Sequence, residues 1–253
     1  MISLKLRIIR EQNRLYSFVL GIISIVQPQC SKIFLFHDIV DNISDVKSRF
    51  AITQISFEEF LIHQLSEGYH PNTFDELEKI ISGKVNKQDH SFIVTFDDVN
   101  ENVYTKAYPF LKEHNIPFII FVTENLIGKP NFLNKEQLLA LSADPLCTVG
   151  SHGCHHVMFR YLSSLEAEKE LKESRLFLEK LTGKDVNCFA FPYGRLVECS
   201  RENIKTLKKS VYYFAFSAIK GNLSHKWLSS KYYLPRINVD ESMIRRLKEA
   251  RKR

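Results

Sequence analysis

Residues 91–122 have the sequence SFIVTFDDVNENVYTKAYPFLKEHNIPFIIFV, in which two apolar runs flank a more polar stretch. Residues 91–96 and 117–122 are rich in Phe, Ile and Val without strict alternation, which is typical of strands buried on both faces. Residues 102–114 between them form a candidate helix. A strand, a helix and a second strand in this order predict a parallel strand pair.

The same alternation of apolar strand and helical segment continues on both sides of this stretch. Further candidate strands cover residues 32–36, 147–150, 187–191, 212–217 and 233–239. Two helix starts are expected where a serine is followed three residues later by a glutamate, the capping-box pattern. These pairs are Ser56 with Glu59 and Ser163 with Glu166. Residues 201–209 are a further candidate helix.

About seven strands that alternate with helices in a chain of 253 residues predict a distorted (β/α) barrel of parallel strands. An open, doubly wound sheet is the alternative. Neither glycine-rich nucleotide fingerprint is present, so nothing favours a dinucleotide-binding fold. No repeat or linker divides residues 31–253, which we expect to form one domain behind a separate segment, residues 1–30.

The composition is that of an ordinary globular chain, with 44% hydrophobic and 25% charged residues. The 19 Phe residues favour aromatic-rich strands over a helical bundle. Part of the net charge of +6 lies at the C-terminus, in Arg245, Arg246, Lys248, Arg251, Lys252 and Arg253. Such an end attracts anionic lipid, nucleic acid or a phosphorylated ligand, or is a solvated helix end. We expect no nucleic-acid partner.

The five cysteines show neither metal-site spacing nor an even count, which favours a reduced chain. In the first 30 residues, basic residues precede an apolar run at residues 15–26, shorter than the roughly 20 residues that span a bilayer. Packing on the domain, an interfacial membrane helix and an export signal are three interpretations, and no small-x-small cleavage pattern follows. We expect a cytoplasmic chain, peripheral to the inner face of the membrane if this segment binds lipid.

Polar side chains follow the predicted strands directly. They are His37 and Asp38 after the first strand, Asp97 and Asp98 after the second, Ser151, His152 and His156 after the fourth, and Pro192, Tyr193 and Gly194 after the fifth. Arg236 lies within the last predicted strand. Because the carboxyl ends of parallel strands converge on one face of a barrel, these groups are expected to meet there. This placement predicts an enzyme.

His152 and His156 are four residues apart, a spacing at which two imidazoles share one face of a helix or turn. An aspartate pair after another strand strengthens the case for a metal site. One carboxylate completes a set of two histidines and a carboxylate, and the other can serve as a base. A helix N-cap explains one of Asp97 and Asp98 but not both.

Three ordered motifs resemble those of the polysaccharide deacetylase family. They are Thr95-Phe-Asp-Asp98, Ser151-His-Gly-Cys-His-His156 and Phe189-Ala-Phe-Pro-Tyr-Gly194. The resemblance extends from about residue 37 to residue 239. The third motif and the stretch Leu234-Pro-Arg-Ile-Asn-Val239 resemble a subgroup that includes poly-N-acetylglucosamine deacetylases.

The resemblance implies that the metal ligands are Asp98, His152 and His156. It also implies that Asp97 is the base that takes a proton from the attacking water. The backbone N–H of Tyr193 would stabilise the oxyanion, and Pro192 would fix the turn that aims it. The expected ion is Zn²⁺, with Co²⁺ and Ni²⁺ as alternatives.

Two departures from the family pattern concern the residues beside the base. Val99 stands where the family usually has Gly, and its bulk is expected to narrow the site or reshape the turn. Ala190 stands where the family often has an Arg that orients the base. We expect Arg236 to contact Asp97 and supply the missing charge, since a nearby guanidinium lowers a carboxyl pKa.

The predicted general acid is His37. It stands directly at a strand end, in a stretch that resembles Tyr-His-Asp of the same subgroup, and its ordinary pKa suits proton donation near neutral pH. Asp38 either orients the ring or caps the next turn. His225 is the rival, because Leu223-Ser-His225 is similar to the family's fifth motif.

The expected function is metal-dependent removal of an N-acetyl or N-formyl group from an amino sugar in a glycan, a glycolipid or a lipid-linked precursor. One alternative is a catalytically silent carbohydrate-binding protein of the same fold. Another is a metal-dependent hydrolase of small amides that contain no sugar.

Overall fold

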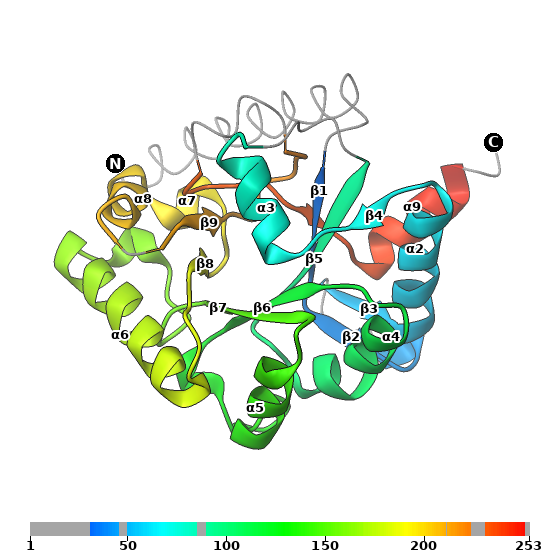
Figure 1. Ribbon diagram of the computed structural model, residues 1–253, viewed down its shortest axis with the longest axis horizontal. Coiled ribbons are helices and arrows are strands. Elements are labelled where there is room, and N and C mark those ends of the chain that lie inside the picture. Colours follow the sequence, from blue (N-terminus) through cyan, green and yellow to red (C-terminus); the bar gives the residue numbers. More distant parts are fainter. Residues whose placement is uncertain (1–30, 46–49, 85–89, 211, 224–230, 251–253) are drawn as a thin grey trace.

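The computed structural model describes residues 31–45, 50–84, 90–210, 212–223 and 231–250. Its centre is an eight-stranded sheet in which all neighbouring strands are parallel, with helices around it (Figure 1). Seven strands follow one path, namely β10 (Ile237–Asn238), β1 (Lys32–Phe36), β5 (Ser91–Asp97), β6 (Phe118–Val122), β7 (Cys147–Ser151), β8 (Cys188–Ala190) and β9 (Phe214–Phe216). The eighth, β4 (His70–Pro71), pairs with β5, while β2 (Asp38–Val40) and β3 (Ala51–Thr53) form a small separate sheet.

Residues 231–239 connect the two edges of the curled sheet. On one side, Leu234 forms a parallel bridge with Phe216 of β9. On the other side, the Val239 N–H donates a 2.9 Å hydrogen bond to the Leu35 carbonyl of β1. The predicted distorted barrel is therefore confirmed. The predicted strand at residues 233–239 is wrong in length, because only Ile237–Asn238 forms regular pairs with β1. Arg236 consequently lies just before a strand rather than within one.

The α-helices of the described residues lie outside the barrel, except α3 (Phe74–Ile81), which packs against strand residues that face the barrel interior. The others are α2 (Gln54–Ser66), α4 (Tyr108–Glu113), α5 (Lys135–Ala143), α6 (Ser164–Thr182), α7 (Leu196–Cys199), α8 (Arg201–Leu207) and α9 (Glu241–Ala250). Short turns are η1 (Ile43–Asp45), η3 (Glu124–Leu126) and η4 (Phe159–Tyr161), and a π-helical turn, η2 (Val103–Ala107), precedes α4. The helix expected at residues 102–114 is thus η2 followed by α4. Among the described residues, no helix has both the length and the apolarity to cross a bilayer.

The two expected capping boxes had different outcomes. The box of Ser163 with Glu166 is present at the start of α6, which ends at left-handed Gly183. The box of Ser56 with Glu59 is wrong, because Thr53 caps α2 and accepts a hydrogen bond from the Ser56 N–H. The Ser56 hydroxyl instead donates to Glu241 at the start of α9, so it ties the two helices together.

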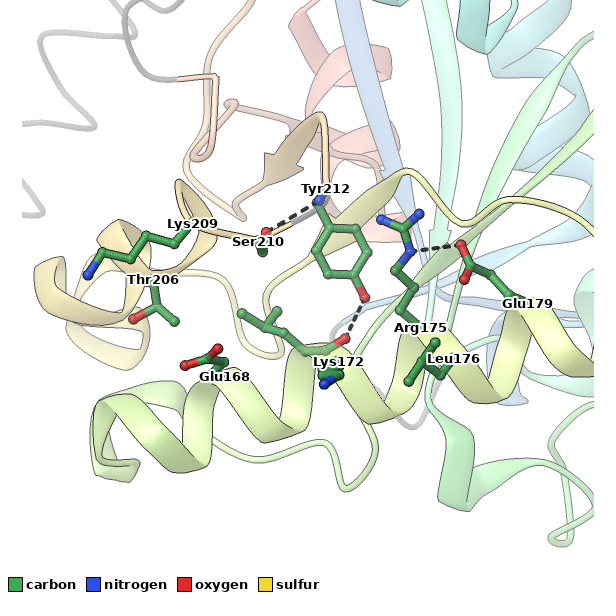
Figure 2. A pocket seen from close by; sticks show the side chains of 10 residues that line it. Glu168, Lys172, Arg175, Leu176, Glu179, Thr206, Lys209, Ser210 and Tyr212 are labelled. Carbon is green, nitrogen blue, oxygen red and sulfur yellow. Dashed lines mark hydrogen bonds and ion pairs between the residues drawn. The ribbon is translucent and has the colours of Figure 1, made fainter.

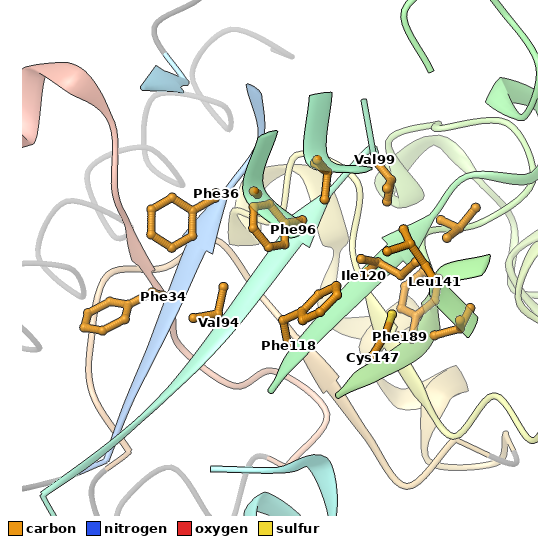
Figure 3. Close-up of a cluster of buried hydrophobic side chains, with 14 of the residues drawn as sticks. Phe34, Phe36, Val94, Phe96, Val99, Phe118, Ile120, Leu141, Cys147 and Phe189 are labelled. Atoms are coloured by element: carbon orange, nitrogen blue, oxygen red, sulfur yellow. The ribbon is translucent and has the colours of Figure 1, made fainter. Parts of the chain in front are cut away.

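Strand residues pack alternately into two apolar layers. Even-numbered residues of β1, β5 and β6 face the surrounding helices, and their aromatic rings form a contiguous cluster (Figure 3). The labelled members on these strands are Phe34, Phe36, Val94, Phe96, Phe118 and Ile120. Odd-numbered residues such as Ile33, Ile93 and Ile119 face the barrel interior, where α3 packs against them. Burial on both faces explains why the strand sequences lack alternation.

Candidate active site

A cavity of about 530 Å³ opens at the carboxyl ends of the strands. All of the ionisable residues predicted for catalysis or metal binding, except Arg236, line it directly. The lining residues are Leu35, His37, Phe50, Asp97, Asp98, His152, His156, Tyr193, Arg195, Ala218, Asn238, Asp240, Ser242 and Arg246. Groups far apart in the sequence thus meet at one end of the barrel, as expected for parallel strands.

The three predicted metal ligands converge. Asp98 Oδ1 lies 2.9 Å from His156 Nε2 and 3.5 Å from His152 Nε2. One donor atom from each residue falls within 4.8 Å of the other two, which is compatible with a shared divalent ion. The neighbouring histidines outweigh the effect of burial on Asp98 and hold the pKa of its carboxyl below the ordinary value.

The donor atoms of this set are suited to a cation. The Nδ1 atom of His152 lies 2.8 Å from the Ala190 carbonyl, a contact that makes Nδ1 the protonated nitrogen and leaves Nε2 as a lone-pair donor. Burial lowers the pKa of His152, which favours the neutral imidazole. Within the described ranges, the buried Oδ1 of Asp98 makes no well-aligned hydrogen bond, and its polar neighbours are the Nε2 atoms of His152 and His156. Two histidines, one carboxylate and an open cavity fit Zn²⁺.

Backbone strain is concentrated around these ligands. Asp98, Val99, His156 and Tyr193 all have φ between 52° and 62°, in the left-handed region that side chains other than glycine rarely adopt. Such strain is typical of functional sites, where packing over-determines the conformation. It also accounts for the usual family preference for Gly at the position of Val99.

Val99 does not narrow the site, so this part of the prediction is wrong. The turn directs its side chain into the hydrophobic core, where it is 1% exposed, and it does not line the cavity. The Val99 N–H donates a 2.7 Å hydrogen bond to the Asp97 carbonyl. This bond stabilises the tight turn that carries Asp97 and Asp98.

The predicted contact between Arg236 and Asp97 is present. Guanidinium atoms Nη1 and Nη2 lie 2.7 Å and 2.6 Å from the two carboxylate oxygens of Asp97, and both side chains are buried. Arg236 is held in turn by the Ser217 carbonyl and by Thr95 Oγ1. Burial raises the pKa of the Asp97 carboxyl, but the Arg236 guanidinium, aided by His152, outweighs it and keeps that pKa below its ordinary value.

Substituting Arg236→Met is expected to lower the free energy of unfolding of the metal-free protein by about 3–5 kcal/mol, because it leaves a buried carboxylate unpaired. Lys248→Met is the matched control, since Lys248 and Glu59 form an ion pair 3.0 Å long in which both side chains are 57% exposed. That variant should lose no more than about 1 kcal/mol. Urea unfolding measures the free energy of unfolding of both variants. Equally small losses in the two would show that the buried pair of Arg236 and Asp97 does not stabilise the fold.

His37 lies at the cavity with its ring stacked on Phe50, 4.8 Å between centroids. Burial holds the pKa of its imidazole below the ordinary value, and the carboxylates of Asp97 and Asp98 oppose this effect without cancelling it. Its buried Nδ1 has no hydrogen-bonding partner in the described part of the chain. Asp38 therefore does not orient the ring; its carboxylate accepts from Asn102 Nδ2 instead. The rival His225 lies outside the described residues.

The Tyr193 turn is tightly supported. The Gly194 carbonyl accepts hydrogen bonds from the Ala218 N–H and the Tyr233 hydroxyl, and a Cβ atom at Gly194 would approach the Ala218 nitrogen to 2.5 Å. Pro192 before it is buried, and the Tyr193 ring lies 4.8 Å from that of His156. The Tyr193 N–H donates to no group within the described ranges, which leaves it available to a ligand.

Sequence analysis missed several cavity residues, namely Phe50, Arg195, Asn238, Asp240, Ser242 and Arg246. Most lie in loops or at the start of α9, and only the closure of the barrel brings them to the site. Asp240 directly follows the predicted last strand, residues 233–239, and Asn238 lies near its end, so both could have been found from the strand-end argument.

Comparison with known proteins identifies the family and the fold. The family model described as "Polysaccharide deacetylase" matches residues 84–212. Over 167 residues the chain is 28% identical to the poly-beta-1,6-N-acetyl-D-glucosamine N-deacetylases of Staphylococcus epidermidis and Staphylococcus aureus, with 61% of this chain and 56% of each relative covered. The chain thus spans little more than half the length of these curated relatives.

Solved structures show the same fold at low sequence identity. IcaB from Ammonifex degensii superposes with a TM-score of 0.76 at 22% identity, covering 88% of this chain and 97% of that one. The Streptococcus pyogenes deacetylase PplD, solved in complex with acetate, also gives 0.76, at 20% identity and with 87% and 97% covered. The motif residues, the barrel and the matched family model lead to one conclusion: this chain belongs to the polysaccharide deacetylase family.

Proposed function

We propose that this chain is a metal-dependent hydrolase that removes an N-acetyl or N-formyl group from an amino sugar. The observation that carries the proposal is the convergence of Asp98, His152 and His156 in one cavity with an aspartate, Asp97, that is paired with a buried arginine. A catalytically silent relative has no need to retain both the ligand set and the base. The names of the curated relatives support an N-acetylated sugar as the substrate.

The residues have separable roles in this proposal. A bound divalent ion, with Zn²⁺ favoured over Co²⁺ and Ni²⁺, supplies polarisation of the acyl carbonyl and a lower pKa for the attacking water. Asp97, held ionised and oriented by Arg236, accepts a proton from that water. The Tyr193 N–H donates to the developing oxyanion from a turn that is already formed. His37 gives a proton to the leaving amine nitrogen.

His37→Ala should retain the metal and lose most turnover on an N-acetyl sugar, because an amine is a poor leaving group until it is protonated. General acids typically contribute about 10²–10⁴-fold to the rate. The loss should be much smaller on an O-acetyl analogue, whose alkoxide leaving group needs less protonation. Equal losses on amide and ester would remove His37 as the acid, and an inactive His225→Ala beside an active His37→Ala would transfer the role.

A substrate panel tests the proposal against its alternatives. It contains a β-1,6-linked N-acetylglucosamine oligomer, N-acetylglucosamine linked through phosphate to a lipid, an N-formyl amino sugar and small amides without a sugar. Release of acetate or formate from a sugar supports the proposal. Hydrolysis of the small amides alone would favour a hydrolase of amides that contain no sugar. Binding of the oligomer without acyl release would favour a catalytically silent carbohydrate-binding protein.

Among these substrates, the basic and apolar residues 1–30 support a lipid-linked precursor, and with it a location at the inner face of the membrane. This segment lies outside the described residues, so the support comes from its sequence.

A further inference from the structure

The loop between His152 and His156 is held from outside the cavity by one buried carboxylate. Glu170 of α6 is 7% exposed, and its Oε1 accepts hydrogen bonds from the Cys154 N–H at 2.8 Å and the His155 N–H at 2.7 Å. Its Oε2 lies 2.9 Å from His155 Nδ1. Hydrogen bonds of backbone N–H groups to a buried carboxylate are charge-assisted and strong for that reason.

The opposite side of the same loop is also fixed. The carbonyls of Gly153 and Cys154 accept hydrogen bonds from the N–H groups of Glu124 and Asn125 in η3. Gly153 has φ of +85°, and a Cβ atom there would lie 3.0 Å from Glu170 Oε1. The loop therefore fits closely between η3 and the Glu170 carboxylate, which leaves little freedom for the two imidazoles at its ends.

The helix that carries Glu170 is anchored to the barrel. The Tyr212 hydroxyl donates a 2.9 Å hydrogen bond to the carbonyl of Leu171, the residue after Glu170. Figure 2 shows the Tyr212 ring lying against this helix. One turn further on, Ser174 Oγ lies 2.7 Å from Ser151 Oγ at the end of β7. The position of Glu170 is thus set by the strand that leads directly into His152.

Cys154, His155 and Glu170 also lie close enough together to suggest a second metal site. The hydrogen bonds argue against a cation there. Glu170 Oε1 already accepts from two backbone N–H groups, and Glu170 Oε2 lies 2.9 Å from His155 Nδ1, so both carboxylate oxygens are already engaged. The cluster is explained instead by the Glu170 carboxylate, which accepts hydrogen bonds from the backbone N–H groups of Cys154 and His155.

We propose that Glu170 is a positioning residue that fixes the His152–His156 loop in the geometry that binds metal. This inference rests on the proposed metal site, but its readout is metal affinity and needs no deacetylase activity. Partners that orient metal ligands typically change metal affinity by about 10–100-fold when they are removed. Glu170→Ala should therefore weaken Zn²⁺ binding by about 10–100-fold.

The test measures Zn²⁺ affinity by competition with a chromogenic chelator, together with the visible absorption spectrum of the Co²⁺-loaded protein. Glu170→Gln keeps an oxygen that can accept both N–H groups and should recover most of the affinity. Glu173→Gln is the matched control on the same helix, because Glu173 is exposed and its carboxylate makes only a long ion pair of 3.9 Å with Lys169. The Zn²⁺ affinity of this variant should equal that of wild type. If Glu170→Ala does not fold, Glu170→Asp replaces it, because the shorter side chain withdraws the acceptor and should weaken binding in the same direction.

Two outcomes would overturn the proposal. One is a folded Glu170→Ala or Glu170→Asp variant with wild-type Zn²⁺ affinity and an unchanged Co²⁺ spectrum. The other is the loss of one of two bound ions in Cys154→Ala or His155→Ala, which would make the cluster a second metal site. An inactive wild-type protein whose metal affinity still depends on Glu170 would contradict the proposed function and leave this inference standing.

Discussion

Asp97→Asn is expected to lower kcat for deacylation by about 10²–10⁴-fold while the metal content stays at the wild-type level, because the variant loses the base but keeps all three ligands. The amide of Asn cannot accept a proton from water at neutral pH. Asp97 is 4% exposed and receives two hydrogen bonds from Arg236, so its ionised form is the resting state of the site. Steady-state kinetics and metal analysis of the same preparation measure the two quantities.

Asp144→Asn is the matched control for this substitution. Asp144 is also a buried aspartate, and it accepts hydrogen bonds from the Tyr108 hydroxyl and the Leu146 N–H outside the cavity. Its variant should keep kcat close to that of wild type. Loss of metal in parallel with activity in Asp97→Asn would make Asp97 a ligand, and near-normal activity would remove it from the mechanism.

His152→Ala and His156→Ala are each expected to lose the metal and, with it, essentially all deacylation. Each variant removes one of three protein ligands from a set in which the donor atoms lie within 4.8 Å of one another. The wild-type protein should hold about one divalent ion per chain. His155→Ala is the control within the same loop, because His155 points toward Glu170 and should leave one ion bound. Full metal occupancy in both ligand variants would show that the site is assigned wrongly.

The strands and the site could be predicted because their signals are local. Apolar runs without alternation identify strands buried on both faces, and polar residues directly after such runs must meet at the carboxyl end of a parallel barrel. Arg236 could be placed beside Asp97 for the same reason, since the last strand of a closed barrel lies next to the first. The helices α3 and α5 were missed although Thr73 with Glu76 and Asn134 with Gln137 form capping boxes.

The errors arose where distant contacts override local pattern. Ser56 and Glu59 match a capping box, but Thr53 lies earlier and caps α2, and the Ser56 hydroxyl bonds to Glu241 across the fold. The effect of Val99 depends on its left-handed backbone, which turns the side chain away from the cavity. Phe50 stacks on His37 from a loop whose position no local signal reveals.

The most direct test of the central claim is to incubate the Zn²⁺-loaded chain with a β-1,6-linked N-acetylglucosamine oligomer and with N-acetylglucosamine linked through phosphate to a lipid. Acetate and free amino groups are then measured in the same sample. A metal-dependent amino-sugar deacetylase must release the two in equal amounts from at least one substrate, and a chelator or Asp97→Asn must stop the release. A fully metal-loaded chain that leaves every N-acetyl and N-formyl sugar intact would contradict the account.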